Sequence, residues 1–401
     1  MSKLDELIAE LCPDGVPYKT LGELGYFYGG LSGKSKEDFT NGNAKFITYM
    51  NVFTNLAIDT DISDLVRIGE NEKQNTVQYG DILFTGSSET PDECGMSSVL
   101  TEVSDEKFYL NSFCFGFRLK DNNLLLPDFS KYLFRSQNIR KQIKRTANGV
   151  TRFNVSKKKM EQVVIPLPPL PVQQEIVRIL DNFTELTAEL TAELTARRKQ
   201  YEYYRDLLLT FGDDVPRLAI SDLLIRTKGT NITAQKMRQL HKKNGEVRIF
   251  AGGKTYADVD FKDIPKKDIN FNPSIIVKSR GIIEFEYYDK PFSHKNEFWS
   301  YYSENKNVNI KFVYYYLSRN VNYFQRIANN MQMPQISIPV TDKYKVPLPP
   351  IKEQERIVSI LDRFDALCND LTSGLPAEIE ARQKQYEYYR DKLLSFKEVT
   401  A

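Results

Sequence analysis

Residues 166–183 read PLPPLPVQQEIVRILDNF, and residues 347–364 read PLPPIKEQERIVSILDRF, a near-copy 181 residues further along. The two segments are identical at 11 of 18 positions. The segment ARRKQYEYYRD at 196–206 returns as ARQKQYEYYRD at 381–391, at an offset of 185. Such a duplication organises the whole chain. The order is therefore variable region, repeated segment, variable region, repeated segment, and a weaker echo, Val16-Pro17 and Val215-Pro216, marks where each unit begins.

Each repeated segment is predicted to be a long helix behind an extended, proline-rich lead-in, because proline cannot continue a helix. The first helix is expected from Val172 to Phe211, 40 residues, or about 60 Å at 1.5 Å per residue. Its apolar residues recur on neighbouring heptad positions, which is typical of a coiled coil. We expect an antiparallel pair with this interface: Ile176, Leu180, Phe183, Tyr201, Tyr204, Leu208, Ile357, Leu361, Phe364, Tyr386 and Tyr389. A plain bundle core is the alternative, but the tyrosines occupy more than one helix face and leave one for a partner.

The two helical segments differ in length by four residues. The first contains the tandem repeat Thr187-Ala-Glu-Leu190 and Thr191-Ala-Glu-Leu194, whereas the second contains Ser373-Gly-Leu-Pro376. Glycine and proline there predict that the second helix kinks or restarts, with Pro376 in a new first turn. A four-residue unit lengthens a helix by about 6 Å and rotates the remainder of that helix by only about 40°.

The variable regions, 15–164 and 214–345, share little sequence and combine short strands with helical stretches. Strands are expected at 80–85 and 274–279, and a helix at the end of each region, at 129–144 and 311–327. The predicted class is α+β: two globular domains separated by two long antiparallel coiled-coil-like helices, as a pseudo-two-fold internal repeat. The predicted segments are 1–164, 165–212, 213–345 and 346–401, with domains of ordinary size.

Basic charge is local rather than global. The chain carries 55 basic and 53 acidic residues, a net charge of +2. Residues 135–160 nevertheless hold nine Lys and Arg and no acid, and residues 226–248 hold seven against Glu246 alone. Such patches suit a phosphate backbone, and nearby amides and hydroxyls suit base edges. The alternative is that these lysine-rich stretches are solvated faces.

The candidate DNA-binding residues are polar or basic side chains in expected loops, the basic ones for phosphates and the others for the major groove. In the first region they are Lys34, Lys36, Ser87, Ser88, Thr90, Lys144, Arg145, Asn148, Thr151, Arg152, Asn154 and Lys157. In the second they are Arg226, Lys228, Lys254, Tyr256, Lys278, Arg280, His294, Lys295, Gln332 and Gln335. His294 could equally be an ordinary surface histidine, and Tyr256 part of a core.

Motifs for catalysis are not recognised. The stretch Gly29–Ser35 ends in Gly-Lys-Ser, but a phosphate-binding loop needs glycine where Tyr28 stands. Asn272-Pro-Ser-Ile275 lacks the second proline and the aromatic residue of the amino-methyltransferase motif. Four scattered cysteines and two histidines argue against a disulfide scaffold or a metal site. We expect no catalytic, cofactor or metal site, no signal peptide and no membrane span, and hence a cytoplasmic protein.

In its order of domains and helices, the chain resembles the specificity subunits of type I restriction–modification systems. The resemblance is carried by LPPLPVQQEIV at 167–177, the tandem Thr-Ala-Glu-Leu, GLPAEI at 374–379, and KQYEYYRD at 199–206 and 384–391. It implies that each variable domain reads one half of a split, asymmetric DNA target. It also implies that the helix pair sets the unread gap, with a length that the Thr-Ala-Glu-Leu copies adjust.

The resemblance further implies partners and cofactors. The helices would dock two modification subunits that bind S-adenosylmethionine and methylate adenine at N6, and restriction subunits using ATP and Mg would join them. This chain would bind double-stranded DNA and no membrane, have no catalytic site and hold no cofactor of its own. Two alternatives are a protein-binding coiled-coil scaffold that never reads DNA, and an enzyme with an unrecognised site.

Overall fold

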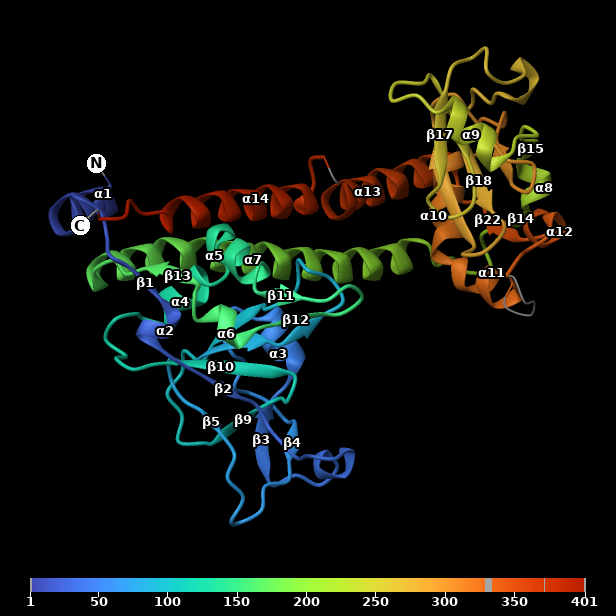
Figure 1. The fold of residues 1–401 in the computed structure, drawn as a ribbon. Helices are drawn as coiled ribbons and strands as arrows, with labels where there is room; N and C mark the ends of the chain where they lie inside the picture. Colours follow the sequence, from blue (N-terminus) through green and yellow to red (C-terminus); the bar gives the residue numbers. More distant parts are fainter. Residues whose placement is uncertain (1, 329–333, 371, 400–401) are drawn as a thin grey trace. The chain divides into compact units, whose positions relative to one another are not determined.

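The computed structural model describes residues 2–328, 334–370 and 372–399, and the chain divides into two compact units (Figure 1). The first unit comprises residues 1–190 and 379–401, and the second comprises residues 191–378. Each unit therefore combines one variable region with parts of both repeated segments, and cuts across the four linear segments expected from the sequence. The first boundary falls between the two copies of Thr-Ala-Glu-Leu.

The repeated segments form helices, as predicted. The first is the single helix α7 (Leu170–Leu208) of 39 residues, and the second is divided into α13 (Ile351–Asn369) and α14 (Leu375–Leu393). The predicted restart is thus confirmed, with Pro376 in the first turn of α14. Helix α7 begins inside the proline-rich lead-in and includes Pro171, because a first-turn residue needs no amide hydrogen for the helix.

The first variable region contains four small sheets. The central sheet is antiparallel, in the order β2 (Gly25–Gly29), β10 (Cys114–Leu119), β6 (Ile82–Thr85) and β8 (Ser97–Val99). A mixed sheet has the order β4 (Leu65–Val66), β3 (Ala44–Ile47), β9 (Phe108–Leu110) and β5 (Thr76–Val77). A third sheet has the order β11 (Ala147–Asn148), β12 (Phe153–Val155) and β7 (Ser87–Ser88). The fourth sheet is the pair β1 (Tyr18–Thr20) and β13 (Val164–Pro166).

The second variable region repeats three of these sheets although its sequence differs. Its central antiparallel sheet has the order β15 (Ile225–Thr227), β21 (Trp299–Tyr302), β18 (Ser274–Lys278) and β19 (Glu284–Tyr288). A second sheet has the order β17 (Tyr256–Val259), β16 (Val247–Phe250) and β20 (Phe292–His294), and β14 (Arg217–Ala219) pairs with β22 (Lys345–Pro347). The parallel pair β3 with β9 corresponds to β16 with β20. The expected strands are confirmed as β6 and β18, and the α+β class and the internal repeat are confirmed with them.

The helical stretch at the end of each region is not one helix, as predicted, but two. These are α4 (Pro127–Leu133) and α5 (Gln137–Lys144), and α10 (Ile310–Arg319) and α11 (Val321–Ala328). Ser136 adopts the extended conformation of an N-cap and starts α5 anew, and Asn320 ends α10. The shorter helical elements are α1 (Lys3–Leu11), α2 (Leu21–Leu24), α3 (Tyr49–Thr54), α6 (Lys157–Met160), α8 (Ile220–Leu223), α9 (Ala234–Leu240), α12 (Ile338–Asp342), η1 (Lys36–Phe39) and η2 (Lys266–Asp268).

The first turns of each repeated helix belong to the core of a variable region. Ile176 and Leu180 are fully buried in the first unit's main cluster, and Ile357 and Leu361 occupy the same place in the second. These four predicted interface residues therefore pack on their own domain, which the heptad pattern did not reveal. Tyr386 also joins the first cluster, while Tyr201 and Leu208 pack against the second.

The remaining aromatic residues make the expected contact between helices. Phe183 stacks on Tyr389 in the first unit, with ring centroids 5.4 Å apart, and Phe364 stacks on Tyr204 in the second, at 5.8 Å. The pairs are equivalent in the repeat, at offsets of 181 and 185. Each unit thus contains the same helix–helix stack, made by one residue from each repeated segment.

A buried glutamine joins each repeated helix to its variable region. In the first unit, the Gln173 side chain donates to the carbonyl oxygens of Leu124 and Pro168 and accepts from the amide of Leu126, at 2.7–2.9 Å. In the second, the side chain of Gln354 makes the same three bonds, two of them to the backbone of Asn307 and Asn309. The proline-rich lead-in before each helix also makes the same backbone contact. The amide of Leu167 donates to the carbonyl oxygen of Pro17, and the amide of Leu348 donates to that of Pro216. The echo at 16–17 and 215–216 thus marks equivalent structure.

A carboxylate about two turns later on each helix adds a second joint. Asp181 accepts from the Tyr132 hydroxyl at 2.6 Å and pairs with Lys131. Its repeat equivalent, Asp362, accepts from the Tyr315 hydroxyl at 2.5 Å and pairs with Lys311. Glutamine and aspartate together fix both the position and the rotation of each helix on its domain.

His294 is a core residue and not the base-contacting loop residue that the sequence suggested. It lies at the end of β20 and is fully buried. Its ring nitrogens contact the carbonyl oxygen of Lys295 at 3.1 Å and the hydroxyl of Ser300 at 3.2 Å. Burial lowers its pKa to about 4.

This burial predicts that the second unit loses stability in mild acid. The folded-state pKa of about 4 lies below the ordinary 6.5, so the unfolded chain binds the proton more readily between these values. The contribution of His294 is complete above pH 6.5, and about 3 kcal/mol of it is lost by pH 4. Denaturant unfolding followed by the fluorescence of Trp299, the single tryptophan, reports on this unit. His294→Gln should flatten the profile over that range, and an equal slope in both proteins would contradict the assignment.

Candidate nucleic-acid interface

An open groove of about 870 Å³ lies on the first variable region. It is lined by Tyr49, Met50, Phe53, Ser87, Ser88, Glu89, Glu93, Phe113, Val150, Thr151 and Arg152. Four of these, Ser87, Ser88, Thr151 and Arg152, are among the residues chosen from the sequence. The groove therefore gathers side chains from separated stretches of the chain at one surface.

One wall of the groove is the hairpin that joins β11 to β12. Strand β12 pairs with β7, which places Asn154 opposite Ser87 and Phe153 opposite Ser88. The Arg152 guanidinium donates to the Ser87 hydroxyl at 3.2 Å and lies over the ring of Phe113, at 5.7 Å. Arg152 is thereby held at the mouth of the groove, where its remaining donors can meet a ligand.

Further predicted residues surround this hairpin. Arg145, Asn148, Asn154 and Lys157 are exposed, and Asn148 accepts a hydrogen bond from Lys159 at 3.0 Å. Close to the hairpin, the hydroxyls of Ser88 and Thr90 donate to Glu93, at 3.3 and 2.9 Å. The groove lining therefore combines one cation, Arg152, with the carboxylates of Glu89 and Glu93 and with hydroxyl groups, while further cations lie nearby on the hairpin and just after it. These are groups that can bond to phosphates and to base edges.

Two arginines of the basic run have a structural role instead. Arg135 donates to the carbonyl oxygens of Ser97, Val52, Phe53 and Asn55, at 2.6–3.2 Å. Arg140 donates to those of Asp92, Cys94 and Gly95. Burial lowers the pKa of each guanidinium to about 10. The nine-cation patch is therefore smaller than the sequence suggested, and these two arginines hold α3 and the turn at 92–95, which border the groove.

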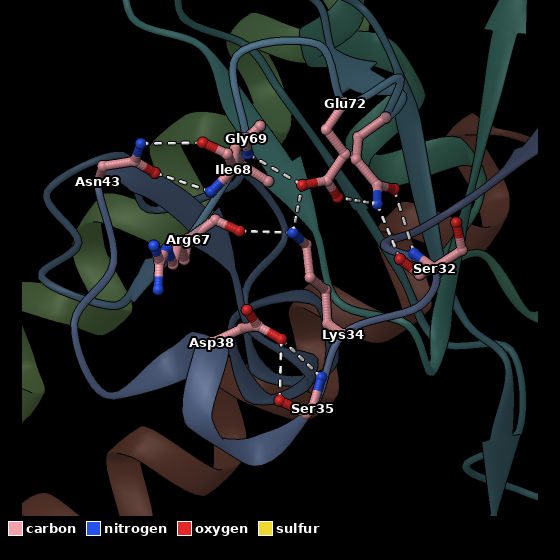
Figure 2. Close-up of polar contacts among 10 residues, drawn as sticks. Ser32, Lys34, Ser35, Asp38, Asn43, Arg67, Ile68, Gly69 and Glu72 are labelled. Atoms are coloured by element: carbon pink, nitrogen blue, oxygen red, sulfur yellow. Dashed lines mark hydrogen bonds and ion pairs between the residues drawn. The ribbon is translucent and has the colours of Figure 1, made fainter.

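Lys34 and Lys144 are likewise engaged within the protein. Lys34 is 9% exposed in its side chain, and its ammonium contacts Glu72 at 2.6 Å and the Arg67 carbonyl oxygen at 2.5 Å (Figure 2). The same carboxylate accepts from the Gly69 amide, and these bonds lower the pKa of Glu72 to about 2. Lys34 is thus a loop anchor rather than a free phosphate ligand. Lys144 pairs with Asp92, while Lys36 is exposed in η1 and does not line the groove.

The second variable region gathers candidate residues around the turn between β16 and β17. A cavity of about 360 Å³ is lined partly by Tyr256 and Lys295, and one of about 180 Å³ partly by Lys254, Tyr256 and Lys278. Sequence reasoning did not select Arg248, although it belongs to the basic stretch at 226–248. Its guanidinium lies 4.1 Å from the Tyr256 ring centre and pairs with Asp258 at 2.7 Å. Tyr256 is exposed rather than part of a core.

Several of the second region's predicted cations are neutralised within the protein. Lys278 is 7% exposed and pairs with Glu286 at 2.7 Å, which corrects its assignment as a free DNA ligand. Lys295 pairs with Glu297, and Arg226 with Asp342, each at 2.6 Å. Lys228, Lys254 and Arg280 are exposed. Gln335 forms a backbone bridge with Arg280, and Gln332 lies outside the described residues.

The sequence reading missed the apolar part of the first groove. Met50, Phe113 and Val150 are exposed large hydrophobic residues that line it. The residues predicted from the sequence in the first variable region are only polar and basic, because hydrogen-bonding side chains are the usual contacts to bases. The sequence signal for this apolar part of the groove was Gly149, which precedes Val150 in a basic stretch that contains no acidic residue.

Metal and thiol chemistry find no support in the described residues. Among them, no three His, Cys, Asp or Glu side chains gather as a metal site would require. All four cysteines are free and buried, and burial raises the pKa of Cys114 to about 12. None of the described helices is long and apolar enough to cross a membrane.

Comparison with known proteins agrees with this architecture. The family model "Type I restriction modification DNA specificity domain" matches residues 13–197 and 218–381. The specificity subunit of EcoR124I/EcoR124II from Escherichia coli is 34% identical over 263 residues, 60% of this chain and 65% of that subunit's length. A putative specificity subunit from Haemophilus influenzae is 35% identical, and the match covers 62% of this chain and 68% of that subunit. A putative specificity subunit from Mycoplasma pneumoniae is 31% identical, and the match covers 63% of this chain and 94% of that subunit.

Solved structures share the fold. The S subunit of a type I restriction–modification system from M. genitalium superposes with a TM-score of 0.57 at 16% identity, covering 95% of this chain and 96% of that one. A chain from a study of assembly and conformational transition in a type I system superposes with a TM-score of 0.58 at 15% identity, covering 96% and 98%. With two family matches that span most of its length, the chain belongs to the type I restriction modification DNA specificity domain family.

Proposed function

We propose that this chain is the non-catalytic DNA-recognition subunit of a type I restriction–modification complex and reads a bipartite target, one half per variable region. The observation that carries the proposal is the repeat itself: one arrangement of sheets occurs twice, each time joined to a copy of the repeated helical segment. Two variable regions that differ in sequence suit a DNA target whose two halves differ in sequence. Cationic and polar side chains at the first groove and around the β16–β17 turn supply the chemistry for DNA.

In this proposal the helix pair sets the unread gap and docks two modification subunits, through which restriction subunits join. Tyr203 and Tyr388, equivalent in the repeat, are exposed, and each packs edge-on against a neighbouring tyrosine that stacks on the other helix. Such rings suit a protein partner. They also favour the second candidate function, a protein-binding scaffold. That candidate would be supported if the association of the complex with DNA did not depend on the salt concentration.

A base-resolution map of N6-methyladenine tests the central claim. Host DNA is compared with and without this chain, with the candidate modification subunit present in both. A new split motif that appears only with this chain is the expected result. An active, assembled modification complex that adds no new motif would favour the scaffold instead.

Deleting Thr191-Ala-Glu-Leu194 should shorten the gap in that motif by about one to two base pairs and leave both halves unchanged. The deletion removes about 6 Å of helix against about 3.4 Å per base-pair step. A length-preserving variant, Thr191→Ala with Glu193→Gln, is the matched control and should keep the gap. The prediction fails if the deleted protein methylates the original motif.

Exchanging residues 15–164 for the equivalent region of another such subunit should replace one half of the motif only. The graft meets the helix at Gln173 through backbone groups at 124 and 126, so its side chains need not match there. Exchanging residues 214–345 should replace the other half. A change in both halves after a single exchange would mean that the regions do not read independently.

A further inference from the structure

The hairpin between β11 and β12 carries an apolar tip. Val150 is 91% exposed, the highest value among the large hydrophobic residues that the structure describes. Gly149 before it has φ of +140°, and a Cβ there would lie 1.9 Å from the carbonyl oxygen of Arg152. The turn therefore requires glycine. A tight, glycine-dependent turn that lifts a valine into solvent is a defined feature of the fold.

The surroundings of this tip are strongly cationic. From Arg145 to Met160 the chain has five basic residues and no acid, and all five are exposed. Glu89 and Glu93 also line the groove, and the Glu93 carboxylate is engaged by hydroxyl donors. An apolar tip between cations suits a polyanion that also offers apolar faces. Duplex DNA has that chemistry, because its bases stack on one another between two negatively charged phosphate backbones.

The hairpin sequence is repeated although the variable regions otherwise share little. Residues 145–156 read RTANGVTRFNVS, and residues 326–337 read RIANNMQMPQIS, at the offset of 181 that relates the helices. The arginine, alanine, first asparagine and serine are identical, and the position of Val150 is again apolar, Met331. The amide of Asn154 is matched by Gln335.

The two copies are also anchored alike where the structure describes both. The amide of Val155 donates to the carbonyl oxygen of Gly86 at 2.9 Å, and that of Ile336 to Ser279 at 3.0 Å. Gly86 and Ser279 directly follow the central strands β6 and β18. The repetition is therefore structural at this point as well as in sequence.

The basic position Arg145 and the apolar position Val150 recur as Arg326 and Met331, although Asn330 replaces Gly149. Features that recur in both regions do not distinguish two different half-sites, so they suit something that the half-sites share. They share the phosphate backbone and the adenine to be modified. Valine and methionine gain nothing from a phosphate but pack well against unstacked base faces. We propose that the hairpin is a sequence-independent wedge whose Val150 enters the base step that opens when the target adenine leaves the duplex, with Arg145 and Lys157 on flanking phosphates. This inference rests on the proposed function.

The test uses the assembled modification complex and a duplex carrying the mapped motif, with 2-aminopurine in place of the target adenine in the first half. The probe brightens when it leaves the stack. Val150→Ser should lower affinity about tenfold and reduce the fluorescence rise, while the methylated motif stays the same. Val103→Ser is the matched control, since Val103 is 81% exposed in the same unit and does not line the groove. It should change neither readout.

A second variant separates a wedge from a base reader. Val150→Met copies the second region's residue at this position, Met331, and keeps Gly149 and Thr151. It should retain affinity within about threefold and leave the motif unchanged. A changed first half would overturn the inference, as would unaltered affinity and fluorescence in Val150→Ser, or a loss of modification-subunit binding by that variant without DNA. A wild-type complex with no split motif would instead refute the proposed function itself.

Discussion

The joint between each variable region and its helix depends on a fully buried amide. Gln173 and Gln354 each satisfy three hydrogen bonds, all to backbone groups. Leaving such groups unpaired in a core would cost about 1–3 kcal/mol each. Because the partners are carbonyl and amide groups, nearly any sequence with the right local backbone can complete the joint. The constraint thus fixes the geometry of the attachment while leaving the side chains of the variable region free to differ.

A second contact makes the joint rigid. Asp181 and Asp362 each bind a tyrosine hydroxyl and a lysine, from α4 in the first variable region and from α10 in the second. A helix held at two points about two turns apart cannot pivot or roll on its domain.

How far the sequence could be interpreted depended on where the relevant partners lie in the chain. The helices and the restart before Pro376 were predictable because periodicity, glycine and proline act locally. The shared topology of the variable regions was not, since it survives in backbone pairing and not in side chains. Lys34, Lys278 and Arg140 were misjudged for one reason: Glu72, Glu286 and the carbonyl of Cys94 are neighbours only after folding. His294 was misjudged because short strands flanked by turns do not reveal which end enters the core.

The first groove is built on the same principle as the helix joints. Its border at α3 and at residues 92–95 is held by Arg135 and Arg140 mainly through carbonyl oxygens. Burial of these two guanidinium groups is costly, and it lowers the pKa of each. The arrangement gains independence from sequence, since carbonyl oxygens remain when side chains change. Backbone-directed contacts therefore hold this border of the groove, while Ser88, Thr151 and Arg152 line the groove itself.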